Sequence, residues 1–209
     1  MTLARYAIGA LLAISLLGGC SSRAAGRLSL QSFGDEPAVL AGRYVVAVYD
    51  YDRAGRTTFY LSEVPLDELT DGRPADAQVV HIELLWQPRP GRTPMDDSAT
   101  NVTIRQVLFA GDEVGVYGGA GFGRPLDRLG SKRLALAIDD ASMRLVERTE
   151  RFADRLGLAT MSGTVTARRD AAKVQRIAHA LNQHVTNAIG RTRIVHDDEV
   201  DAVRVAALP

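Results

Sequence analysis

The chain of 209 residues contains one cysteine, Cys20, so no disulfide can form within it and a cysteine-rich zinc site is excluded. It has no surplus of charge of either sign, because 25 lysine and arginine residues balance 25 aspartate and glutamate residues. A nucleic-acid-binding domain normally carries an excess of basic residues, so we expect no nucleic-acid partner. Hydrophobic residues nevertheless make up 46% of the chain, which is typical of a globular domain and not of a disordered one.

The motifs of common catalytic and cofactor sites are also missing. The sequence contains neither the GxSxG motif of a serine hydrolase nor the HExxH motif of a zinc protease. The glycine-rich segment 118–123 lacks the third glycine of a dinucleotide-binding loop and the lysine of a phosphate-binding loop. We interpret it as a bulge or a strand crossing at which side chains do not fit. The sequence therefore leans against an enzyme and predicts no catalytic residue, metal or cofactor, although dispersed catalytic residues would leave no such motif.

The first twenty residues are the most informative segment. Arg5 precedes residues 7–17, an uncharged and mostly apolar run. As a helix this run would span about 17 Å, against about 30 Å of bilayer hydrocarbon, so it is too short for a stable membrane span. It has the length of the apolar region of a signal peptide. The run ends in an aliphatic residue, two small residues and the cysteine, namely Leu17, Gly18, Gly19 and Cys20.

This segment resembles the signal peptide and lipobox of bacterial lipoproteins. The resemblance implies that signal peptidase II recognises Leu17, Gly18 and Gly19 and cuts before Cys20. It also implies a diacylglycerol group on the Cys20 sulfur and an acyl chain, such as palmitate, on the new amino group. Two or three acyl chains would hold the protein on a membrane essentially permanently. The alternative is an ordinary secretory signal with a coincidental cysteine.

The resemblance also predicts a location in the bacterial cell envelope. In the enterobacterial sorting rule, an aspartate after the lipidated cysteine retains a lipoprotein in the inner membrane. Ser21 stands at that position here, which favours the outer membrane, facing the periplasm.

The sequence indicates one globular domain. After the signal peptide, residues 1–19, we expect a lipidated N-terminus and tether over 20–42, in which Leu28 and Leu30 could begin a strand. Residues 43–195 form the domain, and 196–209 are a tail that the pattern does not place. Runs of β-branched and aromatic residues between turn signals predict strands. These strands cover 43–50, 57–64, 78–86, 101–109, 113–117, 134–138 and 158–168.

Helical periodicity appears in two places. Residues 171–189 carry an apolar face between Asp170 as the N-cap and Gly190 after the last turn. Residues 141–156 also fit a helix, although 143–149 can be read as a strand. The expected fold class is α+β, with a mainly antiparallel sheet or sandwich on which these amphipathic helices pack.

The proline-rich loop after the third predicted strand is the candidate contact surface. It carries the only tryptophan of the chain, and Trp and Arg dominate interface hot spots. We expect the contact surface to consist of Trp86, Arg89, Arg92 and Asp96. The alternative is a loop packed on its own domain with Trp86 in the core.

Three functions follow from these observations. The first is a non-catalytic accessory protein that binds another envelope component or a second copy of itself. The alternative is a carrier or chaperone for lipid or another apolar ligand, with the curved sheet and the last helix enclosing a cavity. The third is an envelope hydrolase, which would need a cleft with convergent titratable groups.

Overall fold

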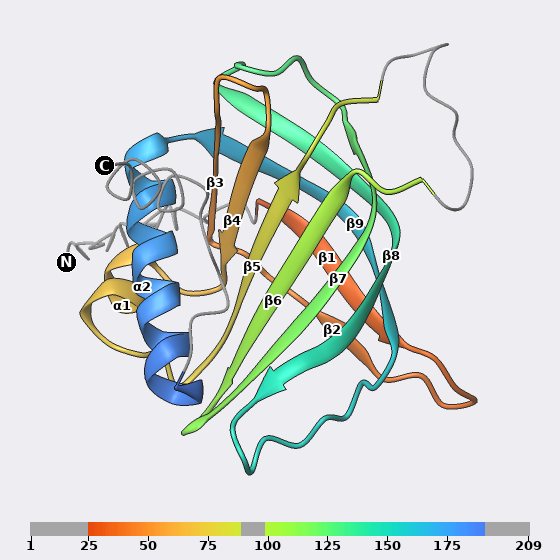
Figure 1. Cartoon of the computed structure of the whole chain (residues 1–209), viewed down its shortest axis with the longest axis vertical. Helices are drawn as coiled ribbons and strands as arrows, with labels where there is room; N and C mark the ends of the chain where they lie inside the picture. Colours follow the sequence, from red (N-terminus) through yellow and green to blue (C-terminus); the bar gives the residue numbers. More distant parts are fainter. Residues whose placement is uncertain (1–24, 89–98, 191–209) are drawn as a thin grey trace, which may run out of the picture.

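The computed structural model describes residues 25–88 and 99–190, which form one nine-stranded sheet and two helices. The sheet is almost entirely antiparallel, so the predicted α+β class is confirmed (Figure 1). The strands are β1 (Gly26–Ser32), β2 (Val39–Ala41), β3 (Val46–Tyr51), β4 (Thr57–Ser62), β5 (Asp76–Leu84), β6 (Val102–Ala110), β7 (Glu113–Pro125), β8 (Arg133–Arg148) and β9 (Ala159–Arg169). The helices are α1 (Leu66–Asp71) and α2 (Ala171–Ile189).

The sheet closes on itself through β9. Strands β3 to β8 pair with their neighbours in chain order, and β9 pairs with β8 along one edge and with β3 along the other. The β3–β9 pair is parallel and short, because β1 occupies the rest of that edge of β9 from Gly26 to Ser32. Strand β2 pairs with β1 and is the edge strand of the sheet.

Alternation along the strands divides the core into two parts. One set of side chains, including Phe59, Ile82 and Ile104, fills the inside of the closed sheet. The other set, which includes Val79 and Val107, lies on the outer face. There it packs against the buried residues of α1 and α2, and Figure 1 shows α2 lying along that side of the sheet.

Helix α2 matches the predicted helix at both ends. The Asp170 side chain accepts a hydrogen bond from the backbone amide of Lys173 at 3.1 Å, as an N-cap residue does. Gly190 has φ of 80°, the left-handed conformation that ends a helix at low cost for glycine. The buried residues of the helix are Val174, Ile177, Ala178, Ala180, Leu181 and Val185.

The predicted helix over 141–156 is wrong, because these residues continue strand β8 to Arg148 and then form a loop. The alternative interpretation of 143–149 as a strand is closer to the structure. The pairing of β8 with β9 is irregular between Ile138 and Ala141. This irregularity interrupts the alternation of apolar residues along β8, so the period-2 signal of the strand is lost there.

The tether predicted for residues 20–42 is too long. Strands β1 and β2 both fall within that range, and Leu28 and Leu30 are buried in the inner core. The suggestion that these two leucines begin a strand is confirmed. The folded part of the chain therefore begins at least 17 residues earlier than the predicted boundary at 43.

The glycine-rich segment 118–123 lies in β7, where that strand pairs closely with β8. A Cβ atom on Gly119 would lie 1.9 Å from the carbonyl oxygen of Ser142, and one on Gly121 would lie 2.5 Å from Cα of Ala141. The register of the two strands also shifts at this point. Of the two interpretations, a bulge or a strand crossing at which side chains do not fit, the structure supports the bulge.

Neither of the helices in residues 25–88 and 99–190 is long and apolar enough to cross a membrane.

Candidate functional site

A pocket of about 650 Å³ opens at the end of the sheet where β2 lies. Its wall comes from β2, the first residues of β5, the last residues of β6, the first half of β7 and the loop 149–158. At this end β4 has already stopped at Ser62, and β2 pairs only with β1 among the described strands. The sheet is therefore incomplete here, which leaves its inner face open to ligands. Its apolar lining includes Leu40, Leu108, Phe152 and Leu156.

Polar side chains cross the inner wall of the pocket from β4 to β6. Glu63, directly after β4, accepts hydrogen bonds from the backbone amides of Arg43 at 2.8 Å and Gln78 at 3.1 Å. The Gln78 side-chain NH₂ group lies 3.5 Å from the same carboxylate. The Gln78 side-chain oxygen in turn accepts a bond of 2.7 Å from the NH₂ group of Gln106. These three residues form a polar row, of which Glu63 and Gln78 line the pocket and Gln106 lies beside it.

Glu63 has no ion-pair partner in the part of the chain that the structure describes. The hydrogen bonds that it accepts all come from neutral amide groups. Burial raises the pKa of the neighbouring Tyr44 phenol well above its ordinary value, and the negative charge of Glu63 adds to this effect. The inner wall therefore carries a negative charge that no basic side chain within residues 25–88 and 99–190 neutralises.

The loop 149–158 is attached to the wall through Tyr117. The Tyr117 hydroxyl donates to the Asp154 carboxylate at 2.5 Å, and the backbone amides of Leu156 and Gly157 bind the same oxygen. This attachment keeps Phe152 and Leu156 buried in the inner core, where they also line the pocket.

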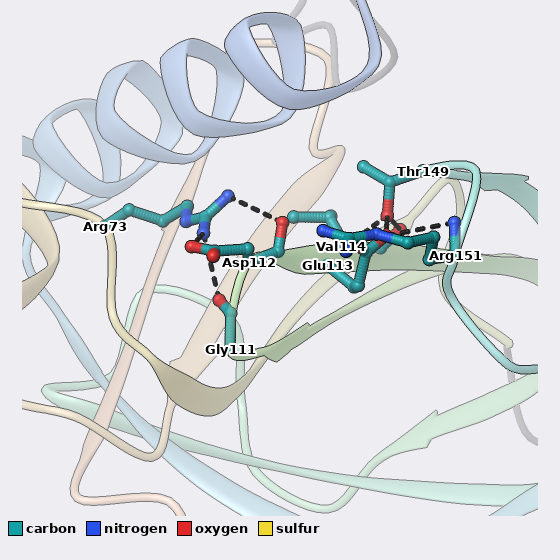
Figure 2. A network of polar contacts seen from close by, with 7 residues as sticks. All are labelled: Arg73, Gly111, Asp112, Glu113, Val114, Thr149 and Arg151. Carbon is teal, nitrogen blue, oxygen red and sulfur yellow. Dashed lines mark hydrogen bonds and ion pairs between the residues drawn. The ribbon is translucent and has the colours of Figure 1, made fainter.

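A second polar network holds the rim of the pocket (Figure 2). Glu113 accepts hydrogen bonds from the Thr149 hydroxyl and from the Arg151 backbone and side chain. On the other side of the β6–β7 turn, Arg73 donates to the carbonyl oxygens of Gly111 and Asp112 and to the Asp112 carboxylate.

This network also sets the charge of the rim. The Thr149 hydroxyl, followed by the charge and hydrogen bonds of Arg151, holds the pKa of Glu113 below its ordinary value. Glu113 is therefore ionised and neutralised by Arg151 at neutral pH.

The predicted contact surface is described only at Trp86. This side chain is 40% exposed and makes an edge contact with Phe122, with ring centroids 6.3 Å apart. Arg89, Arg92 and Asp96 lie outside the described residues, so nothing tests whether the four residues form one surface. Asn101, at the far end of the same loop, is buried and bonds to the Trp86 carbonyl and to the backbone of Gly123.

The residues of the predicted lipid attachment, Cys20 and the preceding Leu17, Gly18 and Gly19, also lie outside the described residues. Within residues 25–88 and 99–190, no three His, Cys, Asp or Glu side chains gather in a way that could hold a metal ion.

The pocket residues were missed by the sequence analysis. Glu63 and Gln78 each interrupt or border a run of apolar strand residues, and a polar residue on the inner face of a strand is the one signal that could have found them. Such a polar residue can be recognised only when the residues on the inner face of each strand are known.

In comparisons with known proteins, no family model, no curated protein and no solved structure matches the chain.

Proposed function

We propose that the protein is a lipid-anchored envelope protein that binds a small, largely apolar ligand in the open end of its sheet. The observation that carries this proposal is the pocket of about 650 Å³. Its volume falls in the range of small-molecule sites, and its mixture of apolar walls with a few convergent polar groups is typical of them. Of the three functions considered from the sequence, the carrier of an apolar ligand fits this geometry best. The pocket lies inside the mouth of the sheet and not between the sheet and the last helix.

The walls of the pocket support ligand binding more than catalysis. The carboxylates of Glu63 and Glu113 are each engaged by hydrogen bonds from this chain, and the Tyr117 hydroxyl is engaged by Asp154. The described residues place no nucleophile paired with a general base in the pocket lining.

Ligand binding is tested with an environment-sensitive apolar dye, N-phenyl-1-naphthylamine, added to the purified protein. We expect saturable fluorescence enhancement that Leu40→Trp weakens by about tenfold, or about 1.4 kcal/mol, because the indole fills the pocket mouth. Leu158→Trp is the matched control, since Leu158 is 66% exposed and does not line the pocket. Equal binding by both variants would place the dye elsewhere and contradict the proposal.

The anchor is tested separately. The lipobox resemblance at Leu17 to Cys20 supports processing by signal peptidase II. Globomycin, which inhibits that enzyme, should then make an unprocessed precursor accumulate in the native host. Normal maturation in its presence, or normal lipid labelling of Cys20→Ser, would contradict the anchor.

The exposed Trp86 favours a second function, the predicted contact with an envelope partner. Trp86 and Leu85 are both exposed, and the Trp86 ring lies beside Phe122. Crosslinking in the host envelope tests this contact. The test variant combines Arg89→Ala and Arg92→Ala. Unchanged crosslinks would count against this surface.

A further inference from the structure

The charge of Glu63 determines which way the side-chain amides of Gln78 and Gln106 are oriented in the polar row. A carboxylate can only accept hydrogen bonds, so the Gln78 side chain must turn its NH₂ group toward Glu63. The Gln78 oxygen then faces Gln106, which must present its own NH₂ group, at 2.7 Å. The Gln106 side-chain oxygen is thereby left at the end of the row.

That oxygen is buried and has no hydrogen-bond partner in the structure. Gln106 is 1% exposed, and its neighbours place it beside the pocket. Gln106 lies on the inner face of β6, as does Leu108 two residues further along, and it pairs with Tyr117 on β7. Leu108 and Tyr117 both line the pocket. A buried carbonyl oxygen without a donor destabilises a folded protein.

The neighbouring donor group is already engaged. The Tyr117 hydroxyl donates to Asp154 at 2.5 Å. The basic side chains of the lining, Arg151 and Arg155, lie on the exposed loop at the rim, and Arg151 pairs with Glu113 at 3.0 Å. The inner wall therefore offers the unneutralised Glu63 carboxylate as an acceptor, with the Gln106 oxygen buried beside the lining, whereas the basic groups of the described lining stand at the rim.

We propose that the pocket selects an apolar ligand whose inserted end donates hydrogen bonds, as an ammonium or a hydroxyl group does. This inference rests on the proposed ligand-binding function and specifies the ligand. An anionic head such as a carboxylate would face the Glu63 charge and be repelled by it. An ammonium head donates to Glu63 and neutralises its charge, and a hydroxyl head donates to it without changing the charge.

The test is a panel of ligands with the same eight-carbon chain, measured by displacement of N-phenyl-1-naphthylamine. Octylamine and 1-octanol carry donors, octyltrimethylammonium carries the charge without a donor, and octanoate carries the opposite charge. We expect octylamine to bind about tenfold or more tightly than octanoate, and 1-octanol to bind more tightly than octyltrimethylammonium.

A carboxylate variant tests the role of Glu63 itself. Glu63→Gln removes the charge and allows the side chain at 63 to donate, which permits the whole row to reverse. It should weaken octylamine by about tenfold and reduce the discrimination against octanoate. Glu68→Gln on the exposed side of α1 is the matched control, because it changes the same charge outside the pocket. Thermal unfolding of both variants verifies that they fold.

Each outcome decides a different claim. If the dye binds and octanoate competes as well as octylamine, the donor preference is overturned while the proposed function stands. Equal competition by 1-octanol and octyltrimethylammonium would also overturn it. If neither the dye nor any of the four ligands binds at the pocket, the proposed function itself fails. The panel on the unaltered protein gives this answer even if Glu63→Gln does not fold.

Discussion

At the scale of single residues, Asn101 connects three strands. Its side chain donates to the carbonyl oxygens of Trp86 at 3.2 Å and Gly123 at 2.7 Å, and it accepts from the amide of Gly123 at 2.6 Å. The residue is fully buried, between the end of β5, the start of β6 and the last residues of β7.

Asn101→Leu should therefore destabilise the protein by about 3 kcal/mol, because it leaves buried backbone groups without partners. Asn182→Leu is the control, since the side-chain oxygen of Asn182 is buried without a partner and its removal should be close to neutral. Denaturant unfolding measures both free energies. Similar losses in the two variants would show that the Asn101 bonds contribute little.

Asp154 makes stability depend on acid pH. Desolvation, the largest single effect, raises its pKa, but the hydrogen bonds from Tyr117, Gly157 and Leu156 together outweigh it, and the net pKa is lowered from 3.8. A carboxyl group with a lowered pKa in the folded state stabilises the fold above its ordinary pKa, and this contribution is lost as the pH falls through the folded value.

We accordingly expect the melting temperature to fall as the pH drops below about 4, and to fall less in Asp154→Asn than in the unaltered protein. Glu113, whose pKa is also lowered, adds to the same loss in both proteins, so the difference between them reports Asp154. Parallel curves for the two proteins would contradict the assignment.

At the scale of elements, the contact of β7 with β8 depends on glycine. Gly119→Val would drive a side chain into the backbone of Ser142, 1.9 Å from the position of the new Cβ atom. The two strands would have to separate, so we expect a loss of about 3 kcal/mol or more, or insoluble protein. Gly72→Val, which has open space around it and an extended backbone, should be tolerated. Soluble yield and thermal unfolding distinguish the two.

The elements differ in how far the sequence predicts them. Helix α2 is predicted at both ends because its signals are local: an Asp N-cap, a 3.6-residue period and a terminal glycine. The sequence does not predict strand β8 correctly, because irregular pairing near Asp139 and Asp140 shifts the alternation of inward and outward side chains. The spacing of Ala141 and Leu145 then resembles that of a helix. Local pattern cannot identify such a shift, since the partner strand that reveals it is distant in the chain.

At the scale of the whole molecule, β1 and β2 belong to the fold. They cover an edge of β9 and add Leu28 and Leu30 to the inner core. Removal of residues 21–42 should abolish cooperative unfolding, because it uncovers that edge and leaves a void in the core. Removal of 21–24 alone should leave unfolding unchanged. Circular dichroism on Cys20→Ser backgrounds measures both, and a folded 43–209 fragment would contradict the expectation.

The pocket could not be predicted for a reason that belongs to this scale. Its lining comes from segments between Ala38 and Leu156, and no two of Glu63, Gln78 and Gln106 are close in sequence. Their common position on the inner wall depends on the register of β4, β5 and β6. The sequence contains these polar residues, but only the closed sheet brings them together.

The position of β9 has a consequence for how the chain reaches its fold. The parallel contact of Val48 with Arg168 joins residues about 120 positions apart, and the sheet cannot close before it forms. Contacts between such distant residues slow folding, because a long loop must be ordered before they form. A chain that emerges amino-end first must therefore wait for β9, and during that interval the edges of β3 and β8 are open to pairing with other chains. We therefore expect folding to be limited by the last strand, and aggregation during synthesis to be most acute just before that strand arrives.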